Sequence, residues 1–260
     1  PFFNEFSERW FIENEVRWRT SHILTVRNAL KKHLIPTFGE KLVNRVDKSE
    51  ILAFRSKLAK VKRSNGSEGL SAERINHIMT PLRMILNEAA DRFGFMTPFR
   101  GIKSLRVPRT DVEPFTLGEV QQIIQTVRPD FKNYYTVKFF TGMRGGEIDG
   151  LQWKYVDFER RQILIRETYV CDEMTITKTD GSQREISMSQ PVVEALQAQH
   201  KVSGKHQFVF CNREGNPLDG KNIRDRVWYP ILRRLNLQRR CPRQTRHTAA
   251  TLWLAAGENP

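Results

Sequence analysis

The segment over residues 97–110, TPFRGIKSLRVPRT, is the feature that most limits how this chain can fold. It contains Pro98, Gly101 and Pro108. Proline fixes φ and lacks a backbone N–H, and glycine favours turns, so neither a helix nor a central strand runs through such a segment. The segment therefore predicts a linker between two folding units. We place the first domain at residues 1–96, the linker at 97–112 and the second domain at 113–260.

Residues 1–96 carry the pattern of an all-helical domain. Apolar residues recur at helical spacing through residues 8–18, 22–38 and 70–94. We expect Pro36 and Gly39 to end the second of these helices. The third stretch is expected to be one long helix, or two helices bent at Pro81. Since no alternating strand pattern interrupts these stretches, the domain is predicted to be helical throughout.

Residues 113–260 mix helical and strand patterns. The stretch QILIRETYV, residues 162–170, alternates well enough for a strand, and residues 181–189 supply a turn and a further strand. Helical stretches flank these strands, including one that is broken around the glycines of TGMRGGEI. The predicted fold class is therefore mainly α with a small β-sheet, in which an all-helical domain is followed by an α+β domain.

The charge of the chain indicates a polyanionic partner. The 43 Lys and Arg face 29 Asp and Glu, which gives a net charge of +14. Between Lys221 and Arg246 there are nine basic residues and one acid, Asp225, more than the solvated face of one helix explains. The segment over residues 97–110 has no acid and four basic residues, Arg100, Lys103, Arg106 and Arg109. We interpret the linker as a basic segment that runs along a DNA backbone and contacts its phosphates. An ordinary solvated linker is the alternative.

Membranes, disulfides and metals are disfavoured by the sequence. No apolar run approaches the roughly 18 residues of a membrane span, and the N-terminal residues lack a signal-peptide cleavage site. The cysteines at 171, 211 and 241 are too far apart for a disulfide framework, which favours a reducing cytosol. The histidines lack the spacing of metal ligands, so we expect neither a metal nor a cofactor. Because the chain begins at Pro1 without Met, we expect it to be a piece of a longer protein.

Two separated segments have the residues needed to hold a phosphate. TGMRGGEI places Arg144 among glycines that allow close approach of a ligand, with Glu147 three residues later. RQTRHT contains Arg243, Arg246 and His247. Guanidinium groups bind phosphate oxygens bidentately and stay charged, so these arginines suit a phosphodiester under attack. Taken singly, each is as readily a surface residue or half of a salt bridge.

Together these segments resemble the tyrosine recombinases, the phage-integrase family. Residues 141–158 are similar to the first arginine box of that family, and residues 243–260 are similar to the second. Residues 70–89 are similar to a stretch of the core-binding domain. The resemblance covers nearly the whole chain. It implies a SAM-like core-binding domain followed by a tyrosine-recombinase catalytic domain that is incomplete at its C-terminus.

The resemblance also implies roles for individual residues. Arg144 and Arg246 would be the two catalytic arginines, with Glu147 and His247 in support. Lys178, in TITKTDGSQREI, would lie on a hairpin with an Asp-Gly turn and protonate the leaving 5′ oxygen. Arg243 stands where the family usually has histidine, and we include it among the catalytic residues. Contacts with DNA are expected from the linker and from three residues of the first domain, Arg74, His77 and Arg83.

The family's nucleophile is a tyrosine that follows a Gly-His pair, and we expect it beyond Pro260. None of the tyrosines of the chain stands in that context; they are Tyr134, Tyr135, Tyr155, Tyr169 and Tyr229. We therefore expect residues 1–260 to bind DNA without cleaving it.

These inferences lead to a site-specific DNA recombinase, an integrase of a phage or another mobile element. It would cleave and rejoin the core of an attachment site through a 3′-phosphotyrosyl intermediate. The resemblance implies a homotetramer on double-stranded DNA, in the cytoplasm of a bacterial host, with no membrane partner. Two alternatives stay open at this point: a type IB topoisomerase, which shares the chemistry, and a DNA-binding regulator without catalysis.

Overall fold

The computed structural model describes residues 1–61, 69–108, 112–176 and 183–257. It divides into two compact units, Pro1–Thr110 and Asp111–Pro260. The division falls inside the segment that the sequence predicts as a linker. Each unit has its own buried core, and each is described by itself.

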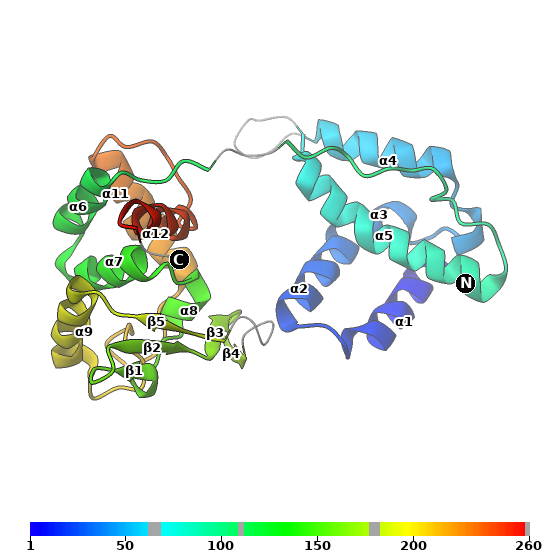
Figure 1. Cartoon of the computed structure of the whole chain (residues 1–260). Coiled ribbons are helices and arrows are strands. Elements are labelled where there is room, and N and C mark those ends of the chain that lie inside the picture. The colour runs from blue at the N-terminus through cyan, green and yellow to red at the C-terminus, as the bar shows by residue number, and fades with distance from the viewer. Residues whose placement is uncertain (62–68, 109–111, 177–182, 258–260) are drawn as a thin grey trace. The chain divides into compact units, whose positions relative to one another are not determined.

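The N-terminal unit is built from helices (Figure 1). Its α-helices are α1 (Phe3–Glu15), α2 (Thr20–Ala29), α3 (Ile35–Phe38), α4 (Lys48–Lys60) and α5 (Ala72–Phe93). A π-helical turn, η1 (Leu30–Leu34), joins α2 to α3, and a 3-10 turn, η2 (Val43–Arg45), precedes α4. Among the described residues of this unit, the isolated bridge between Phe2 and Leu42 is the only strand-like pairing. The predicted all-helical architecture is confirmed.

Helix α5 runs through a proline without breaking. Pro81 lies inside the helix and is buried, and the buried face continues on both sides of it, from Ile75 to Ala90. Packing of that face outweighs the backbone hydrogen bond that proline removes. Of the two predicted alternatives, the single long helix is therefore correct and the bent pair is wrong. The helix ends at Gly94, whose φ of 67° is left-handed.

The π-helical turns of the described residues both lie just before a proline. Pro36 follows η1, and Pro230 follows η5 (Arg224–Trp228). A proline ring clashes with the carbonyl four residues earlier in an α-helix, and a wider turn moves that carbonyl away. The sequence predicts that Pro36 helps to end its helix, but the chain stays helical to Phe38 and stops at Gly39.

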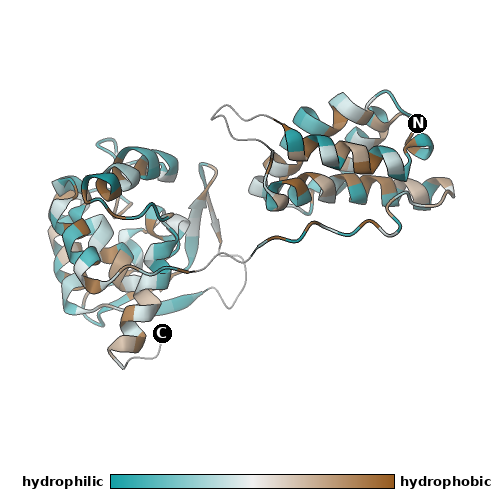
Figure 2. Ribbon diagram, turned by 90° about the horizontal axis from the view of Figure 1, so that it is seen from above, coloured by the Kyte–Doolittle hydropathy of each residue, from teal (hydrophilic) through white to brown (hydrophobic). Residues whose placement is uncertain are grey.

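The core of the N-terminal unit extends into the predicted linker. Aromatic residues of α1, among them Phe3, Phe6 and Trp10, pack in one cluster with the buried face of α5, and Phe99 and Ile102 belong to the same cluster. Figure 2 shows hydrophobic and hydrophilic residues alternating along these helices, as expected for helices with one buried face.

Side chains of α5 also form hydrogen bonds with backbone groups of the segment that follows Thr97. Asn76 accepts from the Leu105 N–H at 2.9 Å and donates to the Leu105 carbonyl at 2.8 Å. Arg83 donates to the Ile102 carbonyl at 2.9 Å. The first part of the segment predicted as a linker is thus packed against the N-terminal unit.

The C-terminal unit has helices around small sheets (Figure 1). Its helices are α6 (Leu117–Thr126), α7 (Pro129–Thr141), α8 (Gly145–Asp149), η3 (Trp153–Tyr155), α9 (Gln190–Ser203), α10 (Gly220–Ile223), η5, α11 (Tyr229–Arg234) and α12 (Gln244–Ala255). Its strands are β1 (Val156–Asp157), β2 (Gln162–Ile165), β3 (Glu167–Val170), β4 (Glu173–Ile176) and β5 (Arg184–Ser187). The predicted class, mainly α with small β-sheets, is confirmed.

The strands form two antiparallel sheets, with the order β1-β2-β5 in one and β3-β4 in the other. The sequence predicts one strand over residues 162–170, but that stretch is two strands divided at Arg166. The turn between β3 and β4 lies at Cys171 and Asp172, both with positive φ. The predicted Asp-Gly turn at residues 180–181, and with it Lys178, lies outside the described residues.

Helix α7 is the centre of the C-terminal unit. It packs against α6, α9 and α12, and its Tyr135 stacks on Trp228 of η5 with ring centroids 5.4 Å apart. Across the described residues, no helix combines the length and the apolar character that a membrane span needs. Because α7 leads directly into the TGMRGGEI segment, its packing fixes where that segment lies.

Candidate active site

Arg144 lies at a sharp bend between α7 and α8. Gly142 caps α7 with a φ of 60°, and Arg144 is the residue that precedes α8. A Cβ on Gly142 would come within 3.1 Å of Ala249 Cβ in α12. Glycine is therefore needed both for the left-handed turn and for the close approach of α12. The side chain of Arg144 is 53% exposed, so its guanidinium can reach a ligand.

Glu147 is the buried anion around which the site is built, with its side chain 2% exposed. Its carboxylate accepts the backbone N–H of Arg144 at 2.8 Å and Nη1 of Arg144 at 2.8 Å. Burial alone would raise the pKa of Glu147, but hydrogen bonds from Arg184 and Arg144 outweigh it and lower the pKa to about 2. Glu147 is therefore ionised at neutral pH.

Arg184, at the start of β5, is a member of the site that was not predicted from the sequence. Its Nη1 donates to Glu147 Oε1 at 3.0 Å, and its Nη2 donates to Oε2 at 2.7 Å. The register pairs Arg184 with Ile165 of β2. The sequence does contain a signal for Arg184. Side chains alternate between the two faces of a strand, so Arg184 lies on the same face as the buried Ile186. A basic residue on a buried face needs an acidic partner, and Glu147 is that partner.

Arg246, on α12, joins the second arginine segment to the first. Its Nη1 donates to the Gly142 carbonyl at 2.7 Å, two residues before Arg144. Burial lowers the pKa of Arg246, and the positive charges of Arg144 and Arg184 lower it further. These positive charges around Arg246 favour an anion beside it.

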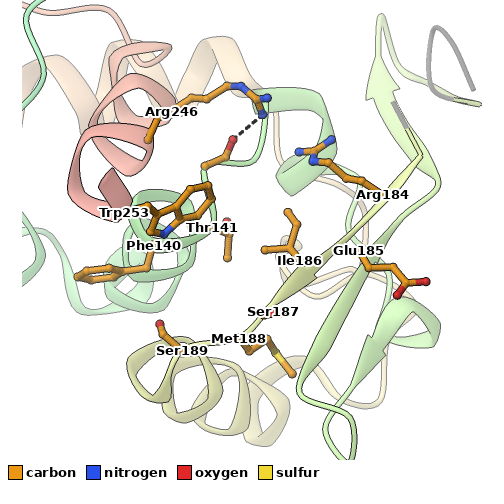
Figure 3. Close-up of a pocket in the computed structure, with 12 residues that line it drawn as sticks. Phe140, Thr141, Arg184, Glu185, Ile186, Ser187, Met188, Ser189, Arg246 and Trp253 are labelled. Atoms are coloured by element: carbon orange, nitrogen blue, oxygen red, sulfur yellow. Dashed lines mark hydrogen bonds between the residues drawn. The ribbon is translucent and has the colours of Figure 1, made fainter. Parts of the chain in front are cut away.

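Two cavities open beside these arginines, and Arg246 borders both. One, of about 620 Å³, has Arg184 and Arg246 on one side and the apolar Phe140 and Trp253 on the other (Figure 3). The second, of about 430 Å³, is lined by four basic residues, Lys138, Arg144, Arg243 and Arg246. An arrangement of cations around open space is suited to binding a phosphate group.

A buried polar chain of Lys138, Tyr134 and Asp149 lies behind the second cavity and was not predicted from the sequence. Lys138 Nζ donates to Tyr134 Oη at 3.2 Å, and Tyr134 Oη donates to Asp149 Oδ1 at 2.7 Å. Burial lowers the pKa of Lys138 and raises the pKa of Asp149. Since Tyr134 and Lys138 are on α7 and Asp149 ends α8, this chain ties α8 to the core. Its sequence signal was a lysine within the apolar run YYTVKFF.

The other predicted residues lie on both units. Arg243 is exposed just before α12, and His247 is half-buried within it. The basic residues predicted to contact DNA lie on the N-terminal unit: Arg74, His77 and Arg83 on α5, and the exposed Arg100, Lys103 and Arg106 after it. Arg83 lies over the Phe99 ring at 5.3 Å. Arg109, like Lys178, is outside the described residues.

None of the chain's five tyrosines lines either cavity described beside the arginines. Tyr134 and Tyr135 are buried, and burial raises the pKa of each of them. Within the described residues there is no group of three or more His, Cys, Asp or Glu side chains that could hold a metal ion. The chemistry that the described site can offer is the binding of negative charge by arginine.

Two family descriptions match this chain. "Phage integrase family" matches residues 114–260, and "Phage integrase, N-terminal SAM-like domain" matches residues 2–59. The first alone covers more than half of the chain. The chain therefore belongs to the phage integrase family, and it is a site-specific recombinase of the tyrosine type.

Curated relatives agree with this assignment, and solved structures share the fold. The chain is 28% identical to "Putative defective protein IntQ" of Escherichia coli K12, over 98% of this chain and 73% of that protein. It is 26% identical to "Prophage integrase IntR" of the same strain, over 99% and 71%. The integrase of the transposon Tn1549 matches with a TM-score of 0.81 at 18% identity, over 100% of this chain and 89% of that one. A lambda integrase matches with a TM-score of 0.78 at 12% identity, over 99% and 92%.

Proposed function

We propose that this chain grips a phosphate of duplex DNA between Arg144 and Arg246 and stabilises it while the strand is cut and rejoined. The observation that carries the proposal is the Arg246–Gly142 hydrogen bond of 2.7 Å. It brings two segments that are far apart in the sequence to one place. There the buried Glu147 orients Arg144, and the two arginines border the same cavity.

The reaction develops negative charge on the non-bridging oxygens of the phosphate. A tyrosine hydroxyl gives up its proton to water and its oxygen attacks phosphorus. The bond from phosphorus to the tyrosine oxygen forms, and the bond to the 5′ oxygen breaks. Arg144 and Arg246 donate to the oxygens that gain charge, and each contributes about 3 kcal/mol to the transition state, by comparison with the loss of an oxyanion-hole donor. The phosphotyrosyl link keeps the bond energy, so the strand can be rejoined without a nucleotide cofactor.

Two further residues complete the proposed machinery. Lys178 supplies the proton that the leaving 5′ oxygen takes up. Arg243, which lines the 430 Å³ cavity with Arg144 and Arg246, adds a third donor for the phosphate but does not transfer a proton, because arginine stays protonated. His247 and Glu147 support the arginines beside them.

The partner we propose is the core of an attachment site in double-stranded DNA. Similar structures have been solved as "a lambda integrase dimer bound to a COC' core site" and "a lambda integrase tetramer bound to a Holliday junction". We propose that four copies of this chain act together on two duplexes, in the cytoplasm of a bacterial host, to integrate or excise a mobile element. The exposed Arg100, Lys103 and Arg106 would contact the DNA backbone, together with Arg74, His77, Arg83 and Arg109.

Two assays on the full-length protein test the proposal against the alternatives. Trapping on a nicked attachment-site duplex should yield a covalent phosphotyrosyl adduct, whereas a DNA-binding regulator gives none. Strand transfer between two attachment sites should then yield recombinant products. A type IB topoisomerase would instead relax supercoiled DNA that has no such site and would give no recombinants.

A further inference from the structure

Arg184 is the arginine of the site to which the proposed function gives no role. It holds both oxygens of Glu147, whereas the Arg144 guanidinium reaches only Oε1. Its side chain is 26% exposed, against 53% for Arg144. Arg184 is thus the more buried partner of Glu147, and it comes from β5, a part of the fold separate from either arginine segment.

The charge of Glu147 would weaken the site if Arg144 were its only partner. A carboxylate 2.8 Å from the Arg144 guanidinium cancels much of the field that Arg144 offers a phosphate, and it also repels the phosphate itself. Arg184 supplies a second cation to the same carboxylate. Three arginines then face one glutamate, so the cluster keeps a positive charge for its ligand.

Arg184 also acts on Arg246. The two side chains enter the 620 Å³ cavity from β5 and α12 (Figure 3). The charge of Arg184 is one of the causes that lower the pKa of Arg246. Arg184 and Arg246 therefore border the same open space, and the charge of each acts on the other.

We propose that Arg184 is a positioning residue of the phosphate site, which neutralises the charge of the Glu147 carboxylate beside Arg144. This inference rests on the proposed function, namely that Arg144 and Arg246 bind phosphate. It makes a prediction that a purely structural role does not. Loss of Arg184 should be repaired by removing the charge of Glu147, because the net charge of the cluster is then restored.

The test uses inorganic phosphate as the probe and residues 1–260 as the protein. Phosphate is titrated at low ionic strength, and the ¹⁵N resonances of the Arg144 and Arg246 guanidinium groups give its dissociation constant. Arg184→Met should weaken binding on the order of tenfold, the effect of one unit charge a few ångströms away near a protein surface. The double variant Arg184→Met/Glu147→Gln should bind within about threefold of the parent.

Arg166→Met is the matched control. Arg166, like Arg184, forms an ion pair with a glutamate, in this case Glu185 of β5 at 3.5 Å, but it does not line either cavity beside the arginines. It should leave the dissociation constant unchanged. If Arg184→Met alone fails to fold, the double variant still carries the test, since binding tenfold weaker than the parent would overturn the inference.

The outcomes separate this inference from the proposed function. If Arg246→Met weakens phosphate binding and Arg184→Met does not, the role of Arg184 is wrong and the phosphate site stands. A double variant as weak as the Arg184 single variant would equally overturn the action through Glu147. If even Arg246→Met leaves phosphate binding unchanged, the site does not hold phosphate and both ideas fail.

Discussion

Replacing Glu147 with glutamine tests how the site is held together. The carboxylate accepts one backbone N–H and three guanidinium N–H groups. Its pKa is about 2 instead of the ordinary 4.5. A pKa lowered by one unit corresponds to about 1.4 kcal/mol, so the ionised carboxylate stabilises the fold by about 3 kcal/mol at neutral pH.

The direction of the pH effect follows from the lowered pKa. The pKa of Glu147 is lower in the folded protein than in the unfolded chain. Its contribution is therefore fully present above pH 4.5 and is lost as the pH falls towards 2. Glu147→Gln should be less stable than the parent by about 3 kcal/mol at pH 7, and the difference should shrink to near zero at pH 2.

Urea unfolding followed by circular dichroism, repeated between pH 7 and pH 2, measures this difference. Glu159→Gln is the control, because Glu159 is an exposed glutamate of the same unit, and it should change the free energy of unfolding by less than about 0.5 kcal/mol. A parent–variant difference that stays constant from pH 5 to pH 2 would refute the account of Glu147 as a buried, ionised anchor.

Three further predictions concern the buried chain, the hairpin and DNA. Lys138→Met should lower the free energy of unfolding by about 3 kcal/mol, because it leaves the buried Asp149 without a nearby positive charge. The double variant Lys138→Met/Asp149→Asn should recover at least about 1 kcal/mol of this loss in urea unfolding. A double variant as unstable as Lys138→Met would contradict the argument. Cys171→Asn should raise thermal stability by a few tenths of a kcal/mol, since Cys171 has a φ of 54° in a two-residue turn, and a loss would refute the turn argument. Arg106→Ala should reduce the slope of log K against log salt for duplex DNA by about 0.9, whereas an unchanged slope would remove Arg106 from the interface.

The helical framework was predictable because it depends on local signals. Apolar spacing predicted the N-terminal helices, and prolines and glycines predicted the segment near which the units divide. Pro81 shows where local signals fail to predict the structure. A proline predicts a break, but burial of the whole α5 face decides otherwise, and burial depends on residues far away in the sequence.

The site was predictable only in part, for the same reason. Arg144, Glu147 and Arg246 lie in recognisable segments, and the structure brings them together. Arg184 depends on the pairing of β2 with β5, which skips over the inserted β3–β4 hairpin. Local alternation cannot fix that register. The burial of Lys138 likewise depends on Asp149, which a different helix supplies.

The most direct test of the central claim is the rate of strand cleavage by the full-length protein with Arg144→Ala. The assay is single-turnover cleavage of a nicked attachment-site duplex, with the DNA affinity of each protein measured in parallel. The account predicts that cleavage slows by about 10²–10³-fold while DNA is still bound, because the lost donor acts on charge that develops only in the transition state. Cleavage at the parental rate would contradict the claim that Arg144 stabilises the phosphate under attack.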